Sequence, residues 1–204
     1  MNRKNLEIFL SQNLVEFTDP NISLEQYSTP PRVAANLIQR ASELGDIHGK
    51  RIIELCAGTG ILSIAATVFG GRVTAVEIDK NAVQIMKQNL EKTDLECEIK
   101  HVDALYFQSP EKFDTAILNP PFGIQQKKAR DMDFIIQAHE LADIAYTIVD
   151  GSIKNQTHLP ILLAKSNIDI LESYLEEFPI KKSYPWHKYN RKIHQVMILR
   201  TCKA

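Results

Sequence analysis

Short apolar segments alternate with amphipathic helical segments between residues 51 and 118, and no other feature constrains the fold as strongly. Each apolar segment has the length and composition of a buried strand, and each intervening segment has apolar residues at helical spacing. This alternation predicts an α/β fold with a doubly wound, mainly parallel sheet. Strands are expected at residues 51–56, 72–77, 97–102 and 113–118, and helices between them at residues 61–69 and 79–92.

The segments on either side of this alternation are less regular. Apolar spacing predicts helices at residues 2–13 and 31–44, and Ser28 or Thr29 is expected to cap the second of them. The same spacing predicts one long helix over residues 132–149. The remaining segments are expected to form a helix at 157–167, a strand or a helix at 168–177, and a strand at 193–201.

The chain as a whole has the composition of a globular protein. Its 204 residues favour one domain, with an N-terminal part, a core and a basic C-terminal segment at residues 1–45, 50–155 and 179–204. No apolar run approaches the ~18 residues of a membrane span, and the N-terminus does not resemble a signal peptide. Three cysteines without a CxxC pair indicate neither a disulfide framework nor a metal site, so we expect a cytoplasmic location.

Positive charge is concentrated at the C-terminus. Seven Lys or Arg residues and no Asp or Glu lie in residues 179–204. Between residues 181 and 192 these cations alternate with Tyr184, Trp186, His187 and Tyr189. Cations next to aromatic faces suit phosphate contact and stacking on single-stranded nucleic acid, whereas a solvated tail with ordinary aromatic packing is the alternative.

The sequence Asn119-Pro120-Pro121-Phe122 follows the strand expected at residues 113–118. Proline cannot donate to a sheet, so the strand must end here, and a residue before proline is extended. One amide side chain, unused carbonyls and an aromatic ring then lie at the carboxyl end of a strand, where open α/β sheets bind ligands. A rigid turn with a packed Phe is the alternative reading.

Three further features lie at the ends of successive predicted strands. A glycine turn, Glu54-Leu55-Cys56-Ala57-Gly58-Thr59-Gly60-Ile61, is followed by Glu77 and then by Asp103. Such a turn and a carboxylate for ribose hydroxyls fit either a nicotinamide dinucleotide or S-adenosylmethionine. The sulfonium cofactor is favoured because the full GxGxxG is absent, because Glu54 and Glu77 add negative charge, and because Asp103 could accept from an adenine amino group. A strand-end carboxylate for Glu77 and a turn cap for Asp103 are the alternatives.

Together these motifs resemble the class I S-adenosylmethionine-dependent N6-adenine methyltransferases, and most closely the methyltransferase-like protein 5 family and its archaeal relatives. The family has a Leu-Glu-Gln-Tyr-x-Thr segment, matched by residues 24–29, and an Asn-Pro-Pro-Phe-Gly motif, matched by residues 119–123. The resemblance spans residues 5–200 and includes a basic loop at 125–130 and a His among basic residues at 187–192. It implies a Rossmann-like, seven-stranded sheet with helices on both faces.

The resemblance also implies a site. Asn119 and Pro120 would accept the two N–H groups of the target amine, Pro121 would stiffen the turn, and Phe122 would stack on the base. The expected cofactor-binding residues are Gln26, Thr29, Glu54, Cys56, Gly58, Thr59, Gly60, Ile61, Glu77, Asp103 and Ala104. The expected RNA-binding residues are Lys127, Lys128, Arg130, Lys181, Lys182, His187, Lys188, Arg191 and Lys192.

Two positions depart from the family pattern, which often has Asp at 54 and Gly at 56. The chain has Glu54 and Cys56 there, and a side chain at 56 is expected to narrow the cofactor pocket.

The function that the resemblance implies is N6-adenosine methylation of RNA, with ribosomal RNA as the expected substrate. Eukaryotic family members work with a small zinc-binding activator subunit, so a similar partner is a hypothesis here. Methylation of DNA adenine or of a protein glutamine is one alternative, because both present a planar NH2 group. A non-catalytic RNA-binding assembly factor that retains the fold is another.

Overall fold

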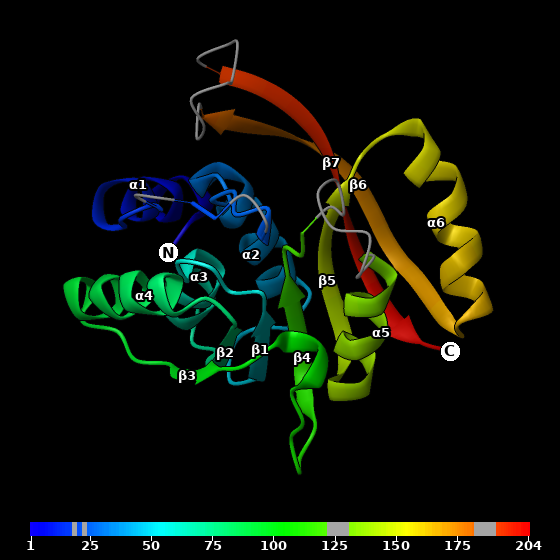
Figure 1. The fold of residues 1–204 in the computed structure, drawn as a ribbon, viewed down its shortest axis with the longest axis horizontal. Coiled ribbons are helices and arrows are strands. Elements are labelled where there is room, and N and C mark those ends of the chain that lie inside the picture. The colour runs from blue at the N-terminus through cyan, green and yellow to red at the C-terminus, as the bar shows by residue number, and fades with distance from the viewer. Residues whose placement is uncertain (18–19, 22–23, 122–130, 182–190) are drawn as a thin grey trace.

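The computed structural model describes residues 1–17, 20–21, 24–121, 131–181 and 191–204. A seven-stranded sheet crosses the molecule in the order β3-β2-β1-β4-β5-β7-β6, with helices on both faces (Figure 1). The first five strands of this order are parallel, and β7 and β6 form an antiparallel hairpin beside them. The strands are β1 (Arg51–Leu55), β2 (Arg72–Glu77), β3 (Glu98–His101), β4 (Phe113–Leu118), β5 (Ala142–Asp150), β6 (Ile168–Lys181) and β7 (Arg191–Lys203).

The helices divide between the two faces of the sheet. The first four in sequence pack on one face, and α5 and α6 pack on the other, each through a separate set of buried apolar residues. The alternation of a strand explains this: on β4, Ile117 points to the first face, whereas Ala116 and Leu118 point to the second. The helices are α1 (Arg3–Asn13), α2 (Pro31–Glu43), α3 (Ile61–Val68), α4 (Lys80–Thr93), the 3₁₀ turn η2 (Ala104–Tyr106), α5 (Asp131–Leu141) and α6 (Ile153–Lys165).

The register of the parallel strands brings their carboxyl ends to one edge. Leu55 of β1 lies opposite both Val76 of β2 and Leu118 of β4. The residues that follow these strands therefore come together, and this edge holds the site described below.

The prediction of one long helix over residues 132–149 is wrong. Helix α5 ends at Leu141 and passes directly into β5, which lies between β4 and β7 in the middle of the sheet. Both faces of β5 are covered, so most of its residues are apolar and show no alternation. No Gly or Pro marks the boundary, so the apolar spacing continues across it. The ambiguous segment at 168–177 forms strand β6.

The predicted cap of α2 is also wrong. The residue before the helix is Pro30, which makes no side-chain cap, and Pro31 occupies the first turn. The hydroxyl of Thr29 instead accepts a hydrogen bond from Asn119, at the far end of β4.

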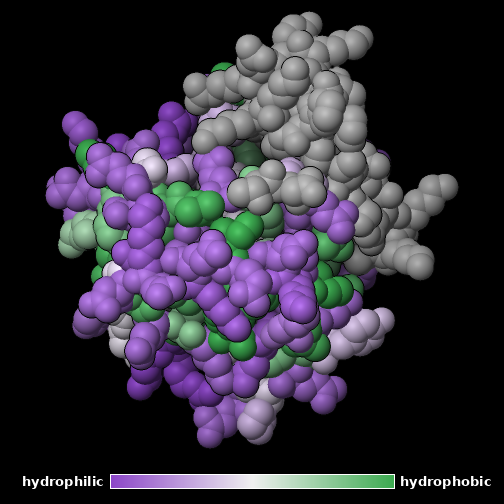
Figure 2. Space-filling model, turned by 60° about the vertical axis from the view of Figure 1, so that its left-hand side comes forward, coloured by the Kyte–Doolittle hydropathy of each residue, from purple (hydrophilic) through white to green (hydrophobic). Residues whose placement is uncertain are grey.

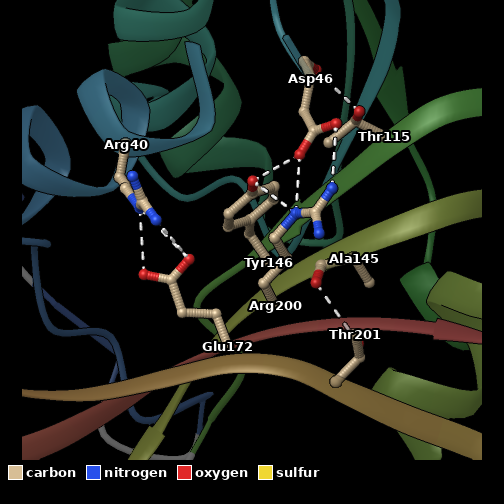
Figure 3. Close-up of polar contacts among 8 residues, drawn as sticks. All are labelled: Arg40, Asp46, Thr115, Ala145, Tyr146, Glu172, Arg200 and Thr201. Carbon is tan, nitrogen blue, oxygen red and sulfur yellow. Dashed lines mark hydrogen bonds and ion pairs between the residues drawn. The ribbon is translucent and has the colours of Figure 1, made fainter. Parts of the chain in front are cut away.

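A buried polar cluster joins the end of α2 to the sheet (Figure 3). The Asp46 carboxylate accepts from the Tyr146 hydroxyl at 2.5 Å and from Arg200 Nε at 2.8 Å, and its backbone carbonyl accepts from Thr115 Oγ1 at 2.7 Å. Tyr146 lies on β5 and Arg200 on the neighbouring β7. The cluster therefore ties three strands to the segment that enters β1.

The β6–β7 hairpin extends past the rest of the sheet (Figure 1). The last residue pair between β5 and β7 is Asp150 with Val196, whereas β6 and β7 continue to pair as far as Lys181 and Arg191. Helix α2 supports the hairpin, because its Arg40 binds Glu172 of β6 with both Nε and Nη2 at 3.0 Å. Figure 3 shows this pair beside the buried cluster.

The surface on the side of α1 and α4 is mainly hydrophilic, with small scattered hydrophobic groups (Figure 2). Among the residues that the structure describes, no helix is long and apolar enough to cross a membrane.

Candidate active site

A pocket lies at the carboxyl ends of β1, β2 and β4. Its walls come from the glycine turn, the ends of these strands, η2 and the segment 24–29 that precedes α2. Most of the residues that the sequence proposes for the cofactor and for catalysis line it: Gln26, Thr29, Glu54, Cys56, Gly58, Thr59, Ile61, Glu77, Asp103, Ala104, Asn119, Pro120 and Pro121. Segments far apart in sequence are thus brought together around one space.

Gly60 is not among the lining residues. Its φ is +83° at the start of α3, and a Cβ at this position would lie 2.5 Å from Met86 Cγ. Glycine is therefore required here for the turn and for close packing against α4. Gly58, by contrast, does line the pocket, where the ring of Phe17 lies against it.

Glu77 holds the glycine turn in place. Its Oε2 accepts from the Gly58 amide at 2.7 Å, and its Oε1 accepts from the Asp79 amide at 2.8 Å. The carboxyl group is buried, and burial raises its pKa above the ordinary value of a glutamate. The Glu77 carboxylate therefore fixes the position of the glycine turn relative to the end of β2.

Glu54 is more deeply buried than the sequence suggests. Its Oε2 accepts from the backbone N–H of Ser63 at 2.7 Å and from the Ser63 hydroxyl. Burial raises the pKa of Glu54 to about 8, although the two bonds from Ser63 oppose this shift. Glu54 therefore holds a proton more readily than an exposed glutamate does, and this reduces the negative charge that the sequence assigns to it near neutral pH.

Cys56 has a φ of +58°, in the left-handed region that favours glycine. This conformation suits glycine better than it suits a residue with a Cβ. The Cys56 side chain is half-buried beside Glu77, Asp103 and Glu54, and desolvation, followed by these charges, raises the pKa of its thiol well above the ordinary value. Cys56 therefore stays a neutral thiol that occupies part of the pocket wall.

The backbone at position 56 predicts an unusual stability order. An alanine normally makes a protein more stable than a glycine does, by about 0.4–1 kcal/mol, because glycine gains entropy on unfolding. Here the left-handed conformation costs a residue with a Cβ about 1–2 kcal/mol. We expect Cys56→Gly to unfold at a higher urea concentration than Cys56→Ala, and to bind the cofactor at least as tightly because the pocket is wider. A Cys56→Ala protein equal to or more stable than Cys56→Gly would contradict the strain.

Asp103 is placed both to cap a turn and to contact a ligand, which are the two roles that the sequence left open for it. Its Oδ1 accepts from the Leu105 amide at 2.9 Å and so caps η2, while the residue also lines the pocket. The cap fixes the direction of the carboxylate, which has a second oxygen to offer to a ligand.

Two segments close the pocket from outside the sheet. Gln26 Nε2 donates to Asp79 Oδ2 at 2.6 Å, which ties segment 24–29 to the start of α4. The fully buried Asn89 binds both backbone groups of Val15, at 2.7 and 3.0 Å, and the Thr59 carbonyl at 3.0 Å. Sequence reasoning missed Phe17 and Asn89, since nothing in their spacing marks them. Ile78 was also missed, although its place directly after Glu77 is a usable signal.

Asn119 lies where β4 ends, at the inner wall of the pocket. Its Nδ2 donates to Thr29 Oγ1 at 2.9 Å. Its Oδ1 is buried and has no hydrogen-bond partner among the residues that the structure describes. A buried acceptor without a partner is costly and marks a place where a ligand donor fits. Pro120 and Pro121 line the same wall, and Phe122 lies outside the described residues.

The residues predicted to bind RNA are only partly covered by the structure. Lys181 ends β6, and Arg191 and Lys192 begin β7, in the part of the hairpin that extends past β5. The others lie outside the described residues: Lys127, Lys128, Arg130, Lys182, His187 and Lys188.

Comparison with known proteins identifies the family. Residues 33–144 match the model of the methyltransferase small domain. The chain is 31% identical to the Danio rerio protein named rRNA N(6)-adenosine-methyltransferase METTL5, with 98% of each chain covered. It is 34% identical to the Drosophila melanogaster protein Mettl5 of the same description, over 93% of this chain and 91% of that one. The solved structure of PH1948 from Pyrococcus horikoshii has a TM-score of 0.91 at 33% identity, over 100% of this chain and 98% of that one. Fold, pocket and near-full-length similarity agree, and the chain belongs to the methyltransferase-like protein 5 family of class I methyltransferases.

Proposed function

We propose that the protein transfers a methyl group from S-adenosylmethionine to N6 of an adenosine in RNA, and that ribosomal RNA is its substrate. The observation that carries this proposal is the Asn119 amide, whose buried Oδ1 has no partner among the described residues, beside Pro120 at the pocket wall. The names of the Danio rerio and Drosophila melanogaster relatives support the choice of adenosine and of ribosomal RNA.

The pocket fits the proposed cofactor. The carboxylates of Glu77 and Asp103, and that of Glu54 when it is ionised, suit a ligand that carries a sulfonium and an ammonium group. Ile78 leaves 47% of its surface exposed at the pocket, which is unusual for a large apolar residue and suits the face of an adenine ring. When bound, the cofactor supplies an electrophilic methyl group. We propose that Glu77 holds its ribose hydroxyls and that Asp103 accepts from its adenine amino group.

The residues of the chain then have to activate a weak nucleophile. The lone pair of an exocyclic adenine nitrogen is delocalised into the ring, so the nitrogen attacks poorly while the amine is planar. Two acceptors, Asn119 Oδ1 and the Pro120 carbonyl, would take its two N–H groups and favour a more pyramidal nitrogen. Acceptors fixed in advance at the place where charge develops give the largest catalytic effects, and no strong base is needed. The target base must leave its stack to enter the pocket.

A methyl-transfer assay tests the proposal directly. Labelled S-adenosylmethionine is incubated with the protein and with ribosomal RNA transcribed in vitro, and the RNA is then digested to nucleosides. We expect label only in N6-methyladenosine. DNA of the same sequence and a glutamine peptide serve as competing substrates. Label in DNA or in the peptide but not in RNA would replace the proposed substrate, and the absence of cofactor binding by calorimetry would contradict an enzyme of any kind.

We propose that the extended part of the β6–β7 hairpin holds the RNA. Support comes from its position beyond β5 and from the cross-strand pairs of Lys181 with Arg191 and of Ile180 with Lys192, which place basic residues on both strands. We call this extended part of the hairpin, beyond the last β5–β7 pair, the arm. The ion pairs of Arg32 and Arg40 of α2 with Glu176 and Glu172 of β6 would fix the orientation of the arm relative to the rest of the protein.

The salt dependence of RNA binding measures this contribution. A variant with Ala at the five basic positions 181, 182, 188, 191 and 192 is expected to bind RNA more weakly at low salt. The slope of log affinity against log salt should fall by about 0.7 for each phosphate of single-stranded RNA that the variant no longer neutralises. The matched control replaces five exposed lysines elsewhere, Lys4, Lys80, Lys87, Lys92 and Lys154. An unchanged slope in the first variant, or an equal loss in the control, would refute the role of the arm.

We also propose that a small zinc-binding subunit assists the enzyme by covering an apolar edge of the sheet. Strand β6 is an outer strand of the sheet, and its Leu171 and Leu175 leave 48% and 44% of their surface exposed, which supports this proposal. A purified chain that is monomeric and fully active alone would undermine this proposal.

We also propose that the protein is located in the cytoplasm. The three cysteines of the chain are free thiols, as expected in a reducing compartment.

A further inference from the structure

We infer that Thr29 is a positioning residue for the reaction, because its hydroxyl holds the Asn119 side chain at the wall of the pocket. The inference rests on the proposed function and deepens it. The resemblance suggests Thr29 only as a cofactor contact, and its hydroxyl is not a helix cap. Its observed bond is to Asn119, 90 residues away in the sequence.

The two ends of the Asn119 side chain lie in different surroundings. Nδ2 donates to Thr29 Oγ1 at 2.9 Å, and Thr29 is the one hydrogen-bond partner of this side chain within the described part of the chain. Oδ1 is buried and unpartnered there, and both residues line the same pocket. The atom that has to accept the amine N–H therefore has no competing donor among the described residues.

The orientation of the amide decides whether the site can work. With Nδ2 on Thr29, Oδ1 is presented to the amine as an acceptor. With the amide rotated by half a turn, Nδ2 would face the N–H groups of the amine, and donor would meet donor. In the observed orientation Thr29 Oγ1 accepts from Nδ2 and holds the side chain in place, and loss of this acceptor leaves the Nδ2 N–H unpaired and the side chain free to move.

The position of Thr29 itself is rigid, so that its hydroxyl can restrain the side chain of Asn119. It leaves only 6% of its surface exposed and is followed by Pro30 and Pro31, which restrict the backbone. The Pro30 carbonyl accepts from the Ala34 amide at 3.0 Å and starts α2. Helix α2 buries Val33, Ala34, Ala35, Leu37, Ile38 and Ala41 in the core. The Thr29 hydroxyl is therefore fixed to the body of the protein.

The test compares Thr29→Val, which keeps the shape and removes the hydroxyl, with Thr29→Ser, which keeps the hydroxyl. Full-length proteins are assayed with S-adenosylmethionine and ribosomal RNA transcribed in vitro, and cofactor binding is measured by calorimetry. We expect Thr29→Val to lower kcat about 10²-fold, the size of effect that a misplaced group produces. Its dissociation constant for S-adenosylmethionine should stay within about threefold of the parent, since the lost bond is to Asn119. Thr29→Ser should restore most of the lost kcat.

Each other result decides against the inference. A loss that appears in cofactor affinity while kcat at saturation is unchanged would mean that Thr29 acts through the cofactor. An equal loss in Thr29→Ser and Thr29→Val would mean that the shape of the residue, not its hydroxyl, matters. Parent protein that forms no N6-methyladenosine would overturn the proposed function and this inference together, whereas an active parent with an unaffected Thr29→Val overturns the inference alone.

Discussion

Asn119→Ala is expected to lower kcat for methyl transfer about 10³-fold, close to the upper range for loss of one preorganised hydrogen-bonding group. The substitution removes the acceptor at the end of β4 and leaves the glycine turn, Glu77 and Asp103 in place. The affinity for S-adenosylmethionine should therefore stay within a few fold, as measured by calorimetry. Single-turnover kinetics with saturating cofactor and RNA separate the chemical step from binding.

A second asparagine gives the matched control. Asn81 is exposed in the first turn of α4 and is not among the residues that line the pocket. Asn81→Ala should retain the parent rate. If Asn119→Ala keeps more than a tenth of the parent kcat, or if its loss is explained by weaker cofactor binding, Asn119 does not have the role proposed for it.

Asp46→Ala is expected to lower the free energy of unfolding by about 3–5 kcal/mol, the cost of breaking a buried ion pair from one side. The change leaves the Arg200 guanidinium without its carboxylate and the Tyr146 hydroxyl without its acceptor (Figure 3). The side chains of Arg200 and Asp46 are only 19% and 12% exposed, so water compensates little. Urea unfolding followed by circular dichroism measures the loss.

Two further variants are expected to lose less stability than Asp46→Ala does. Tyr146→Phe removes the two hydrogen bonds of the Tyr146 hydroxyl, to Asp46 and from Arg200, but leaves the ion pair in place, and should cost about 1–3 kcal/mol. Glu111→Ala breaks the ion pair with Arg51 at the surface, where Glu111 is 71% exposed, and should change stability by less than about 1 kcal/mol. An Asp46→Ala protein as stable as the Glu111→Ala protein would show that the cluster does not hold the sheet together.

The fold could be predicted wherever apolar periodicity and turn residues agree. The strands and helices from residue 51 to residue 118 are found within about two residues of their expected bounds, because glycines and capping residues separate them. The failure at residues 132–149 has the opposite cause. Strand β5 is buried on both faces and joins α5 without a break in the apolar pattern, so only the tertiary position of the segment distinguishes strand from helix.

The pocket could be predicted from strand ends, since parallel strands bring their carboxyl ends to one edge. What the sequence could not give is the direction of each side chain. The position of Gly60 suggests a ligand contact, yet its open space is taken by Met86. The pattern around Thr29 suggests a helix cap, yet its hydroxyl reaches Asn119. Both outcomes depend on contacts between segments distant in the sequence, which local propensity does not contain.

The burial of Glu54 makes binding in this pocket a proton-coupled event. The carboxyl groups of Glu54 and Glu77 both have raised pKa values in the free protein, and that of Glu54 is about 8. A cationic ligand stabilises the ionised carboxylate, so its entry near neutral pH displaces the proton of Glu54 into solution. We therefore expect affinity for the cofactor to rise with pH through the range in which Glu54 ionises in the free protein. The product of methyl transfer has lost the sulfonium charge, so its release is favoured by the return of the same proton.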